Sequence, residues 1–284
     1  MGLCFLVNIG NMLVESSRRL DILKRLFSLD GQVAAVVGGA GRIGKAICRA
    51  LAEAGADVAI VDLDAQAAAT LGLELALGTG RPVIAAPADA TKAAELNRAV
   101  EQISDELGPP RLLVNSAQFR GGGFYSSRVE DYPQAAWNQV LDVNLTGVHL
   151  ACQAFGRSML RHGGGAIVNL ASTYGVVSPD PRIYGDSGVN SPVAYAAAKA
   201  GVINLTRYLA VHWREANIRV NCLVPGGVFD QQSAEFVENY CRRTPLARMA
   251  TPEDYQGAVL FMLSPASAYM TGAVVTVDGG WTAW

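Results

Sequence analysis

From Gly31 onward, short β-branched runs alternate with alanine-rich helical stretches, and this alternation restricts the fold more than any other feature. The expected strands span residues 33–37, 57–62, 82–89, 111–117, 166–172, 218–226 and 273–280. The expected helices span residues 42–54, 65–77, 92–107, 135–160 and 195–216. Continuous apolar strands separated by helices are typical of a parallel sheet that is covered on both faces. We therefore expect an α/β fold, a single-domain doubly wound parallel sheet of about seven strands.

Residues 1–29 precede this pattern and differ from it. The first 14 residues are apolar, but no Lys or Arg precedes them, so they lack the basic start of a signal peptide. A spanning helix needs ~20 apolar residues, and Leu6 stands where N-myristoylation requires Ser or Thr. We expect residues 1–29 to be an N-terminal extension, floppy or helical, or the product of a start codon placed before Met12. Residues 30–284 then form the domain.

The composition argues against several classes of function. With a net charge of −2 and 7% aromatic residues, the chain lacks the basic excess and the stacking surface of nucleic-acid-binding proteins. Five scattered cysteines without a CxxC indicate a reducing compartment rather than a disulfide framework. The three histidines form neither HExxH nor HxH, which disfavours a metal hydrolase. We expect a cytoplasmic protein that binds no metal, nucleic acid or membrane.

A glycine-rich turn joins the first expected strand to the first expected helix. Gly38, Gly41 and Gly44 lie there, where glycines permit a tight turn and let a pyrophosphate approach the helix N-terminus. Asp62 ends the second strand about 20 residues later, as an acidic residue should that hydrogen-bonds an adenosine ribose. Each feature alone is a weak signal, because turns and strand ends often carry such residues. Together, in this strand–turn–helix context, they predict a Rossmann-like dinucleotide site.

Tyr195 and Lys199 stand four residues apart on an expected helix, so their side chains share one face. Ser172 precedes them at the end of the fifth strand, on the sheet edge where doubly wound folds bind ligands. A free tyrosine has a pKa of ~10, and a lysine ammonium at ~4–5 Å would lower it toward neutrality. These three residues predict proton exchange with an alcohol or a carbonyl.

Taken in order, the motifs of residues 30–284 resemble those of the classical short-chain dehydrogenase/reductase family. Residues 37–44 are similar to its glycine motif, residues 115–118 to its Asn-Asn-Ala-Gly motif, Pro225-Gly226 to its Pro-Gly motif, and residues 278–280 to its Asp-Gly-Gly end. The positions that match its catalytic residues are Asn144, Ser172, Tyr195 and Lys199.

This resemblance implies a role for each matched residue. Tyr195 would exchange a proton with the substrate, and Ser172 would hydrogen-bond the reacting oxygen. Lys199 would lower the tyrosine pKa and bind the nicotinamide ribose, and Asn144 would hold a water in a proton relay through Lys199. The hydride would belong to a nicotinamide cofactor. The residues expected to bind that cofactor are Gly38, Arg42, Ile43, Gly44, Asp62, Asp89, Asn115, Ala117, Tyr195, Lys199, Pro225, Gly226 and Val228.

Two residues favour different cofactors. The carboxylate of Asp62 can accept hydrogen bonds from both ribose hydroxyls of NAD, and it would repel the 2′-phosphate of NADP. Arg42 replaces a glycine of the family motif and could reach that phosphate. We expect Asp62 to dominate, because Arg42 can swing to solvent or pair with Asp62. The expected cofactor is therefore NAD, with NADP used less well.

Residues 178–192 make the segment between Ser172 and Tyr195 longer than the family usually shows. This polar insert, rich in turn-forming residues, is either a surface loop or a lid over the substrate, because long ordered loops are often functional. As a lid, it would place Arg182, Tyr184, Asp186 and Asn190 against a polyol or a charged sugar derivative.

We expect an NAD-dependent short-chain alcohol dehydrogenase or carbonyl reductase that acts on a small molecule, such as a polyol or sugar derivative. The resemblance also implies a homotetramer, with helices 135–160 and 195–216 at the shared faces. Two alternatives stay open: a catalytically quiet NAD-binding sensor or scaffold on the same fold, and a 3-oxoacyl carrier-protein reductase that uses NADPH. The complete catalytic set favours the enzyme over the sensor, and the low positive charge disfavours carrier-protein docking.

Overall fold

The computed structural model describes residues 21–119, 128–187 and 189–284 of the 284-residue chain. The apolar stretch 1–14 and Cys4, which entered the predictions about targeting and redox compartment, lie outside the described residues. Residues 21–27 are helical, and Leu29 is buried in the core with its N–H donating to the carbonyl of Ala54 at 2.8 Å. Leu29, assigned from sequence to the extension, therefore packs with the domain.

Seven strands form one sheet in the order β3-β2-β1-β4-β5-β6-β7. They are β1 Val33–Val37, β2 Asp57–Val61, β3 Val83–Ala85, β4 Leu112–Asn115, β5 Gly165–Leu170, β6 Ile218–Pro225 and β7 Val274–Val277. Every pair of neighbours is parallel. The strand order reverses between β1 and β4, which is the switch point where doubly wound sheets bind ligands. The predicted fold class is confirmed.

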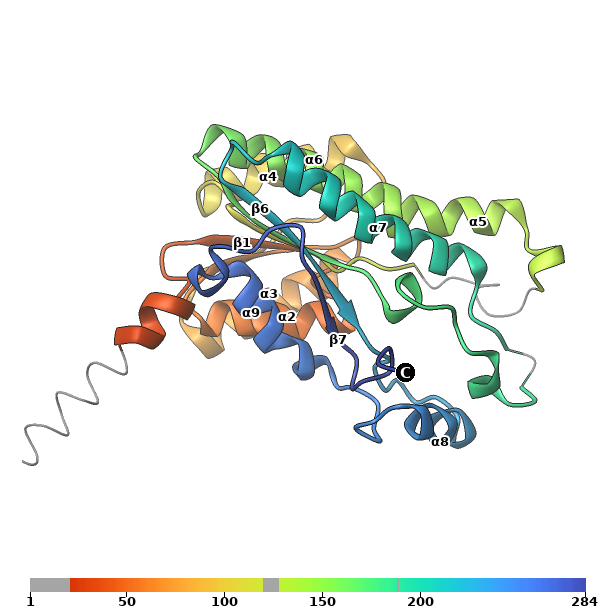
Figure 1. The fold of residues 1–284 in the computed structure, drawn as a ribbon. Helices are drawn as coiled ribbons and strands as arrows, with labels where there is room; N and C mark the ends of the chain where they lie inside the picture. The colour runs from red at the N-terminus through yellow and green to blue at the C-terminus, as the bar shows by residue number, and fades with distance from the viewer. Residues whose placement is uncertain (1–20, 120–127, 188) are drawn as a thin grey trace, which may run out of the picture.

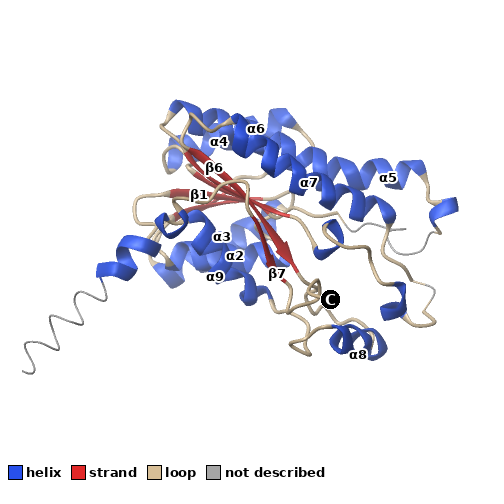
Figure 2. Ribbon diagram, in the orientation of Figure 1, coloured by secondary structure: helices blue, strands red, loops and turns tan. Residues whose placement is uncertain are grey.

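Helices cover both faces of this sheet (Figures 1 and 2). The helices are α2 Arg42–Glu53, α3 Ala65–Thr79, α4 Ala93–Glu106, α5 Gln134–Leu141, α6 Gly147–Arg161, α7 Val193–His212, α8 Ala234–Arg243 and α9 Gln256–Leu263. Side chains of α4, α6 and α7 pack in one core cluster, and those of α2, α3 and α9 pack in a second cluster on the opposite face. Both faces of the inner strands are thereby buried, which explains why these strands are mostly apolar.

The predicted helix 135–160 is continuous but not regular. Between α5 and α6 the residues Asp142–Thr146 form a π-helical turn, η2, which packs against α7. Such turns concentrate at functional sites in proteins. The strand expected over 82–89 is shorter and is limited to β3. Helix α3 ends at Thr79, close to the predicted end near Gly78, and Gly80 caps it in the left-handed conformation.

Two helices, α8 and α9, were missing from the sequence-based assignment. Helix α9 packs on α2 and β5, whereas α8 lies beyond the sheet edge beside the C-terminal residues (Figure 1). Among the described residues, no helix combines the length and the hydropathy needed to cross a membrane.

Candidate active site

The glycine turn between β1 and α2 is built for close backbone contact. Gly38 has φ +77°, and a Cβ on it would lie 2.5 Å from the backbone nitrogen of Ala117, after β4. A Cβ on Gly44 would lie 2.1 Å from the carbonyl oxygen of Gly38. Neither position accepts a side chain, so backbone alone lines the turn at the start of α2. The neighbouring Ile43 is partly buried against the core.

Asp62, directly after β2, holds this turn in place. Its Oδ2 accepts a hydrogen bond of 2.9 Å from the N–H of Ala40, and its Oδ1 accepts one of 3.1 Å from the N–H of Asp64. The carboxylate is therefore fixed beside the turn at the end of β2, as the sequence predicted. Each carboxylate oxygen has a second acceptor position that these bonds leave uncommitted.

Arg42 does not pair with Asp62 or extend freely into solvent, as the sequence reasoning supposed. Its Nη1 donates to the carbonyl oxygen of Phe229 at 2.8 Å, and its Nη2 forms an ion pair with Asp230. Both partners belong to the loop that follows β6, 187 and 188 residues along the chain. No local pattern in the sequence indicates a partner so distant.

Asp89 lies in the segment after β3, beside the start of α4. Its Oδ1 accepts from the N–H and the hydroxyl of Thr91, at 2.9 and 2.7 Å, and the Nζ of Lys92 is 3.4 Å from its Oδ2. Hydrogen bonds from the Thr91 hydroxyl and then from its N–H, with a smaller effect of Lys92, lower the pKa of Asp89 despite partial desolvation. A negative charge is therefore maintained at this position.

The side chain of Asn115 is buried between the sheet and the helices that cover it and is not exposed to solvent. Its Nδ2 donates to the Oδ1 of Asn169 at 2.8 Å and contacts the Sγ of Cys152 at 3.3 Å. Asn169 is the register partner of Asn115 on β5, and it donates in turn to the Oγ1 of Thr206 on α7 at 3.0 Å. This buried chain ties β4, β5 and α7 together, and sequence reasoning missed Asn169 because nothing local distinguishes it.

Lys199 and Tyr195 share one face of α7, as their spacing predicted. The Nζ of Lys199 is 5.7 Å from the centroid of the Tyr195 ring and donates to the carbonyl oxygen of Leu170 at 2.9 Å. Both side chains are buried. Ser172, also buried, follows β5 and begins the short helix η3 Thr173–Gly175, which packs against α7. The end of β5 thus lies close to α7, the helix that carries Tyr195 and Lys199.

Asn144 lies in the π-helical turn η2 and is fully buried. Its Nδ2 donates to the carbonyl oxygen of Val140 at 3.0 Å, and its Oδ1 accepts from the N–H of Phe119 at 3.3 Å. Because η2 packs against α7, the fold gathers all four predicted catalytic residues around one helix.

Aromatic side chains surround Tyr195, a feature that sequence reasoning did not identify. Phe119, Tyr132, Trp137 and Tyr174 pack against the small cluster that contains it. Burial, and next the proximity of Tyr184, raises the pKa of Tyr174 well above its usual range, so its hydroxyl stays protonated. Tyr174 also shares a side-chain hydrogen bond with Tyr184, which belongs to the insert.

Within the insert 178–192, the short helix η4 Pro181–Tyr184 packs against α8. Ile183 and Tyr184 are buried in a cluster with residues of α8 and with Trp281, and the rings of Tyr184 and Phe236 are 5.3 Å apart. Among the other candidate substrate contacts, Arg182 pairs with Asp180, Asp186 is exposed, and Asn190 accepts a hydrogen bond from the N–H of Ser191.

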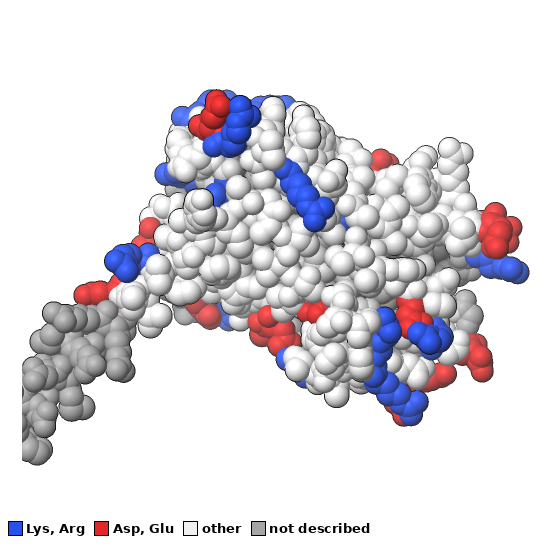
Figure 3. Space-filling view, in the orientation of Figure 1, with Lys and Arg blue, Asp and Glu red and all other residues white. Residues whose placement is uncertain are grey.

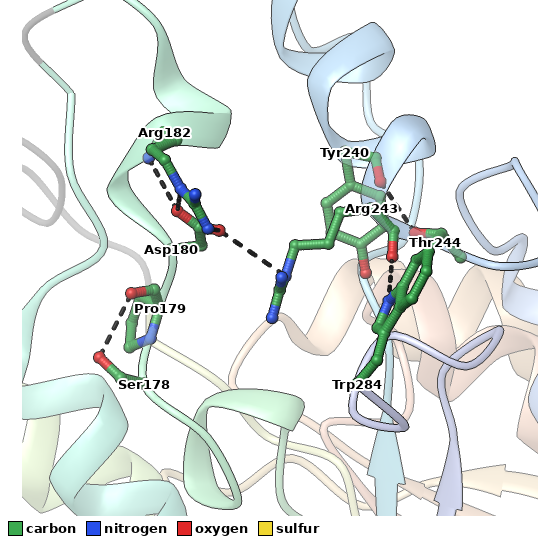
Figure 4. A network of polar contacts seen from close by, with 8 residues as sticks. All are labelled: Ser178, Pro179, Asp180, Arg182, Tyr240, Arg243, Thr244 and Trp284. Carbon is green, nitrogen blue, oxygen red and sulfur yellow. Dashed lines mark hydrogen bonds and ion pairs between the residues drawn. The ribbon is translucent and has the colours of Figure 1, made fainter.

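Polar contacts lock the insert to α8 and the C-terminus (Figure 4). Asp180 pairs with Arg182 at 2.8 Å and lies 3.7 Å from the Nε of Arg243, the last residue of α8. Trp284 donates from its Nε1 to the carbonyl oxygen of Arg243 at 2.9 Å, while the Arg243 guanidinium lies over the ring of Trp281. Three segments distant in sequence therefore form one unit.

Pro225 ends β6 at the carboxyl edge of the sheet, and Gly226 follows it. The N–H of Gly226 donates to the carbonyl of Val277 at 3.0 Å, and its carbonyl accepts from the hydroxyl of Tyr255 at 3.0 Å. Val228 pairs with Ala250 in an isolated bridge. The loop after β6 is thereby anchored before it reaches Arg42.

Comparison with known proteins identifies the family. A family model described as "Enoyl-(Acyl carrier protein) reductase" matches residues 38–282. Galactitol 2-dehydrogenase (L-tagatose-forming) of Cereibacter sphaeroides is 36% identical, over 92% of this chain and 99% of its own. D-threitol dehydrogenase of Mycolicibacterium smegmatis is 36% identical, over 90% of this chain and 95% of its own. The chain belongs to the short-chain dehydrogenase/reductase family.

Solved structures agree with that assignment. A gluconate 5-dehydrogenase from Burkholderia cenocepacia J2315, in complex with NADP and tartrate, is 29% identical to this chain. It superimposes with a TM-score of 0.83 and covers 92% of this chain and 99% of its own. The protein is thus an oxidoreductase, as the sequence motifs predicted.

Proposed function

We propose that this protein is an NAD-dependent dehydrogenase that interconverts a secondary alcohol of a polyol or sugar derivative and the corresponding carbonyl. The observation that carries the proposal is the buried ammonium of Lys199, held 5.7 Å from the Tyr195 ring. A fixed positive charge at this position stabilises the phenolate that accepts a proton during alcohol oxidation.

The catalytic roles follow from the chemistry of each side chain. Tyr195 takes the hydroxyl proton during oxidation and returns it during carbonyl reduction. Ser172 hydrogen-bonds the reacting oxygen and orients it toward Tyr195. Asn144, on the π-helical turn, carries protons onward by holding water near Lys199. Removal of any one of these four side chains should lower turnover more than it lowers cofactor affinity.

The residues at the switch point fit a dinucleotide. The turn around Gly38 and Gly44 admits no side chain, and that exposed backbone at the start of α2 is what a pyrophosphate requires. Asp62 would hold the adenosine ribose, and Asp89 would lie near the adenine. Ala117 and Gly226, which follow β4 and β6, would line the remaining part of the cofactor. When bound, the nicotinamide supplies the hydride acceptor or donor.

The cofactor preference rests on Asp62. Its carboxylate is anchored by two backbone N–H groups, so it cannot withdraw from a 2′-phosphate. The related gluconate 5-dehydrogenase was solved with NADP, so the preference must come from residues of this chain and not from its family. We expect NAD(H) to be used at least about tenfold better than NADP(H) in kcat/KM, about 1.4 kcal/mol.

The substrate proposal rests on the relatives and on the insert. Dehydrogenases of galactitol and D-threitol, both polyols, are among the similar proteins. Tyr174, two residues after Ser172, shares a side-chain hydrogen bond with Tyr184 of the insert. Phenol hydroxyls can both donate hydrogen bonds to sugar hydroxyls and accept hydrogen bonds from them. We propose that the insert, held by α8, covers the substrate and that Tyr184 positions Tyr174.

We also propose a cytoplasmic homotetramer. The outer face of α7 exposes Tyr208 and Val211, and the face shown in Figure 3 is largely uncharged over this helix. Exposed apolar side chains of this kind favour contact between subunits. The four cysteines among the described residues are free thiols, which suits a reducing compartment. Light scattering at micromolar concentration tests the assembly, and a monomer would contradict it.

A substrate screen tests the activity. Galactitol, threitol, gluconate and a 3-oxoacyl thioester would each be offered with NAD(H) and NADP(H), and the absorbance of the reduced nicotinamide would be followed. We expect turnover of a polyol or its ketose with NAD(H), and its loss in Tyr195→Phe. Turnover of the thioester alone, with NADPH, would instead identify a carrier-protein reductase.

A further inference from the structure

The glycine turn is joined to the loop after β6 by one side chain. Arg42, the first residue of α2, reaches Phe229 through a 2.8 Å hydrogen bond and Asp230 through an ion pair. The link spans the edge of the sheet from β1 to β6, which two other strands separate. Both side chains of the pair remain about half exposed, at 47% and 40%.

Arg42 would otherwise be well placed to bind a phosphate. With Ala40, Lys45, Arg49 and Glu74 it lines a groove of about 540 Å³ beside α2. Ala40 is the residue whose N–H binds Asp62, so this groove adjoins the carboxylate that we assign to the ribose. A guanidinium facing such a groove is the preferred partner of a phosphate, because it can bind two oxygens at once.

We propose that Asp230 is a second residue that determines cofactor specificity, because it holds Arg42 away from the 2′-phosphate of NADP. Asp62 repels that phosphate directly. Asp230 acts indirectly, because it pairs with the Arg42 guanidinium, the cation that would otherwise offset this repulsion. This inference deepens the proposed function and rests on its placement of the ribose beside Asp62. A carboxylate at position 230 thus lets the chain keep an arginine in the glycine turn while favouring NAD.

The size of the effect follows from the exposure of the pair. Ion pairs that are largely exposed to solvent are weak, so Asp230 restrains Arg42 without locking it. We expect Asp230→Asn to raise the affinity ratio of NADP to NAD about fivefold. The change should come from tighter NADP binding, and NAD binding should change little.

The test is a double-mutant cycle with nucleotide affinity as the readout. NAD and NADP would be titrated by calorimetry into the wild type, Asp230→Asn, Arg42→Ala and the double variant. Glu74→Gln, which breaks the exposed pair with Arg49 in the same groove, is the matched control. Thermal unfolding would show that each variant remains folded.

The proposal requires that Asp230→Asn raise the ratio and that the rise vanish in the Arg42→Ala background. It is overturned if Asp230→Asn leaves the ratio unchanged, or if the ratio rises equally when Arg42 is absent. A wild type that prefers NADP would contradict the proposed cofactor but not the role of Asp230, because the ratio between variants is measured separately. The two failures are therefore distinguishable.

Discussion

The Nζ of Lys199 lies 5.7 Å from the centroid of the Tyr195 ring, and the same nitrogen donates a 2.9 Å hydrogen bond to the carbonyl oxygen of Leu170. Leu170 is the last residue of β5, the neighbour of the central strand β4, at the carboxyl edge of the sheet. The sheet thereby sets the position of the ammonium, and the ammonium sets the electrostatic environment of the phenol. Because Tyr195 and Lys199 are four residues apart on α7, the helix itself places their side chains next to each other.

Lys199→Met should therefore abolish most of the turnover. The variant keeps the length of the side chain but removes the charge that stabilises the phenolate. We expect kcat to fall by about 10²–10³, with the remaining activity shifted to higher pH. Lys24→Met, which removes an exposed lysine outside the sheet, is the control and should leave the pH profile unchanged. An unshifted profile in Lys199→Met would contradict the electrostatic role.

Asp62→Ala should narrow the preference for NAD(H). The substitution removes the carboxylate that would bind the ribose hydroxyls of NAD and repel the 2′-phosphate of NADP, so NAD should lose more affinity than NADP. It also frees the N–H of Ala40, which weakens the turn for both cofactors. Asp64→Ala is the matched control, because Asp64 only caps α3 by accepting from the N–H of Ala67. That control should cost about 1 kcal/mol of stability. Ratios of kcat/KM for the two cofactors would show whether Asp62 alone sets the preference.

Gly38→Ala tests the glycine turn. The new Cβ would collide with the backbone at Ala117 and force an unfavourable φ, so we expect lower stability by at least about 1 kcal/mol and much weaker NAD binding. Gly78→Ala offers the contrast, because a Cβ there meets nothing within 4 Å and the residue lies within α3. That variant should stabilise the protein by about 0.5–1 kcal/mol. Thermal unfolding and cofactor titration report both effects.

Asp254 gives a pH dependence of stability with a definite sign. Hydrogen bonds from Arg248, the largest cause, lower the pKa of Asp254 from 3.8 to about 2. A depressed pKa in the folded state stabilises the protein above the unfolded value, and that stabilisation is lost as pH falls from about 4 to about 2. Asp254→Asn should therefore be less stable than wild type near neutrality. Urea unfolding at several pH values should show the two proteins converging in acid.

Local sequence was sufficient to predict those parts of the candidate site that depend on residues close together in the chain. The turn at Gly38, Asp62 at the end of β2 and the pair Tyr195 and Lys199 all depend on strand–turn–helix order or helical spacing. The structure places them as that order predicts. The parallel fold follows in the same way, because both faces of the apolar strands are buried.

Other parts depend on contacts that no local pattern records. Arg42 pairs with Asp230, which lies 188 residues later in the sequence. Asn115 bonds to Asn169 because the register of β4 and β5 places the two residues side by side. Helix α8 is amphipathic, but its partner is the insert, whose docking site was not predictable from turn-forming residues. The π-helical turn at Asn144 packs against α7, and no local pattern distinguishes it from a regular helix, which was therefore the natural expectation.

The role of Tyr195 as the proton carrier is tested by the rate at which Tyr195→Phe reduces NAD with the polyol that the wild type oxidises best. The substitution keeps the buried ring and removes the hydroxyl that carries the proton. We expect kcat to fall by about 10²–10⁴ while the affinity for NAD stays within about twofold of wild type. Turnover close to that of the wild type would contradict this role.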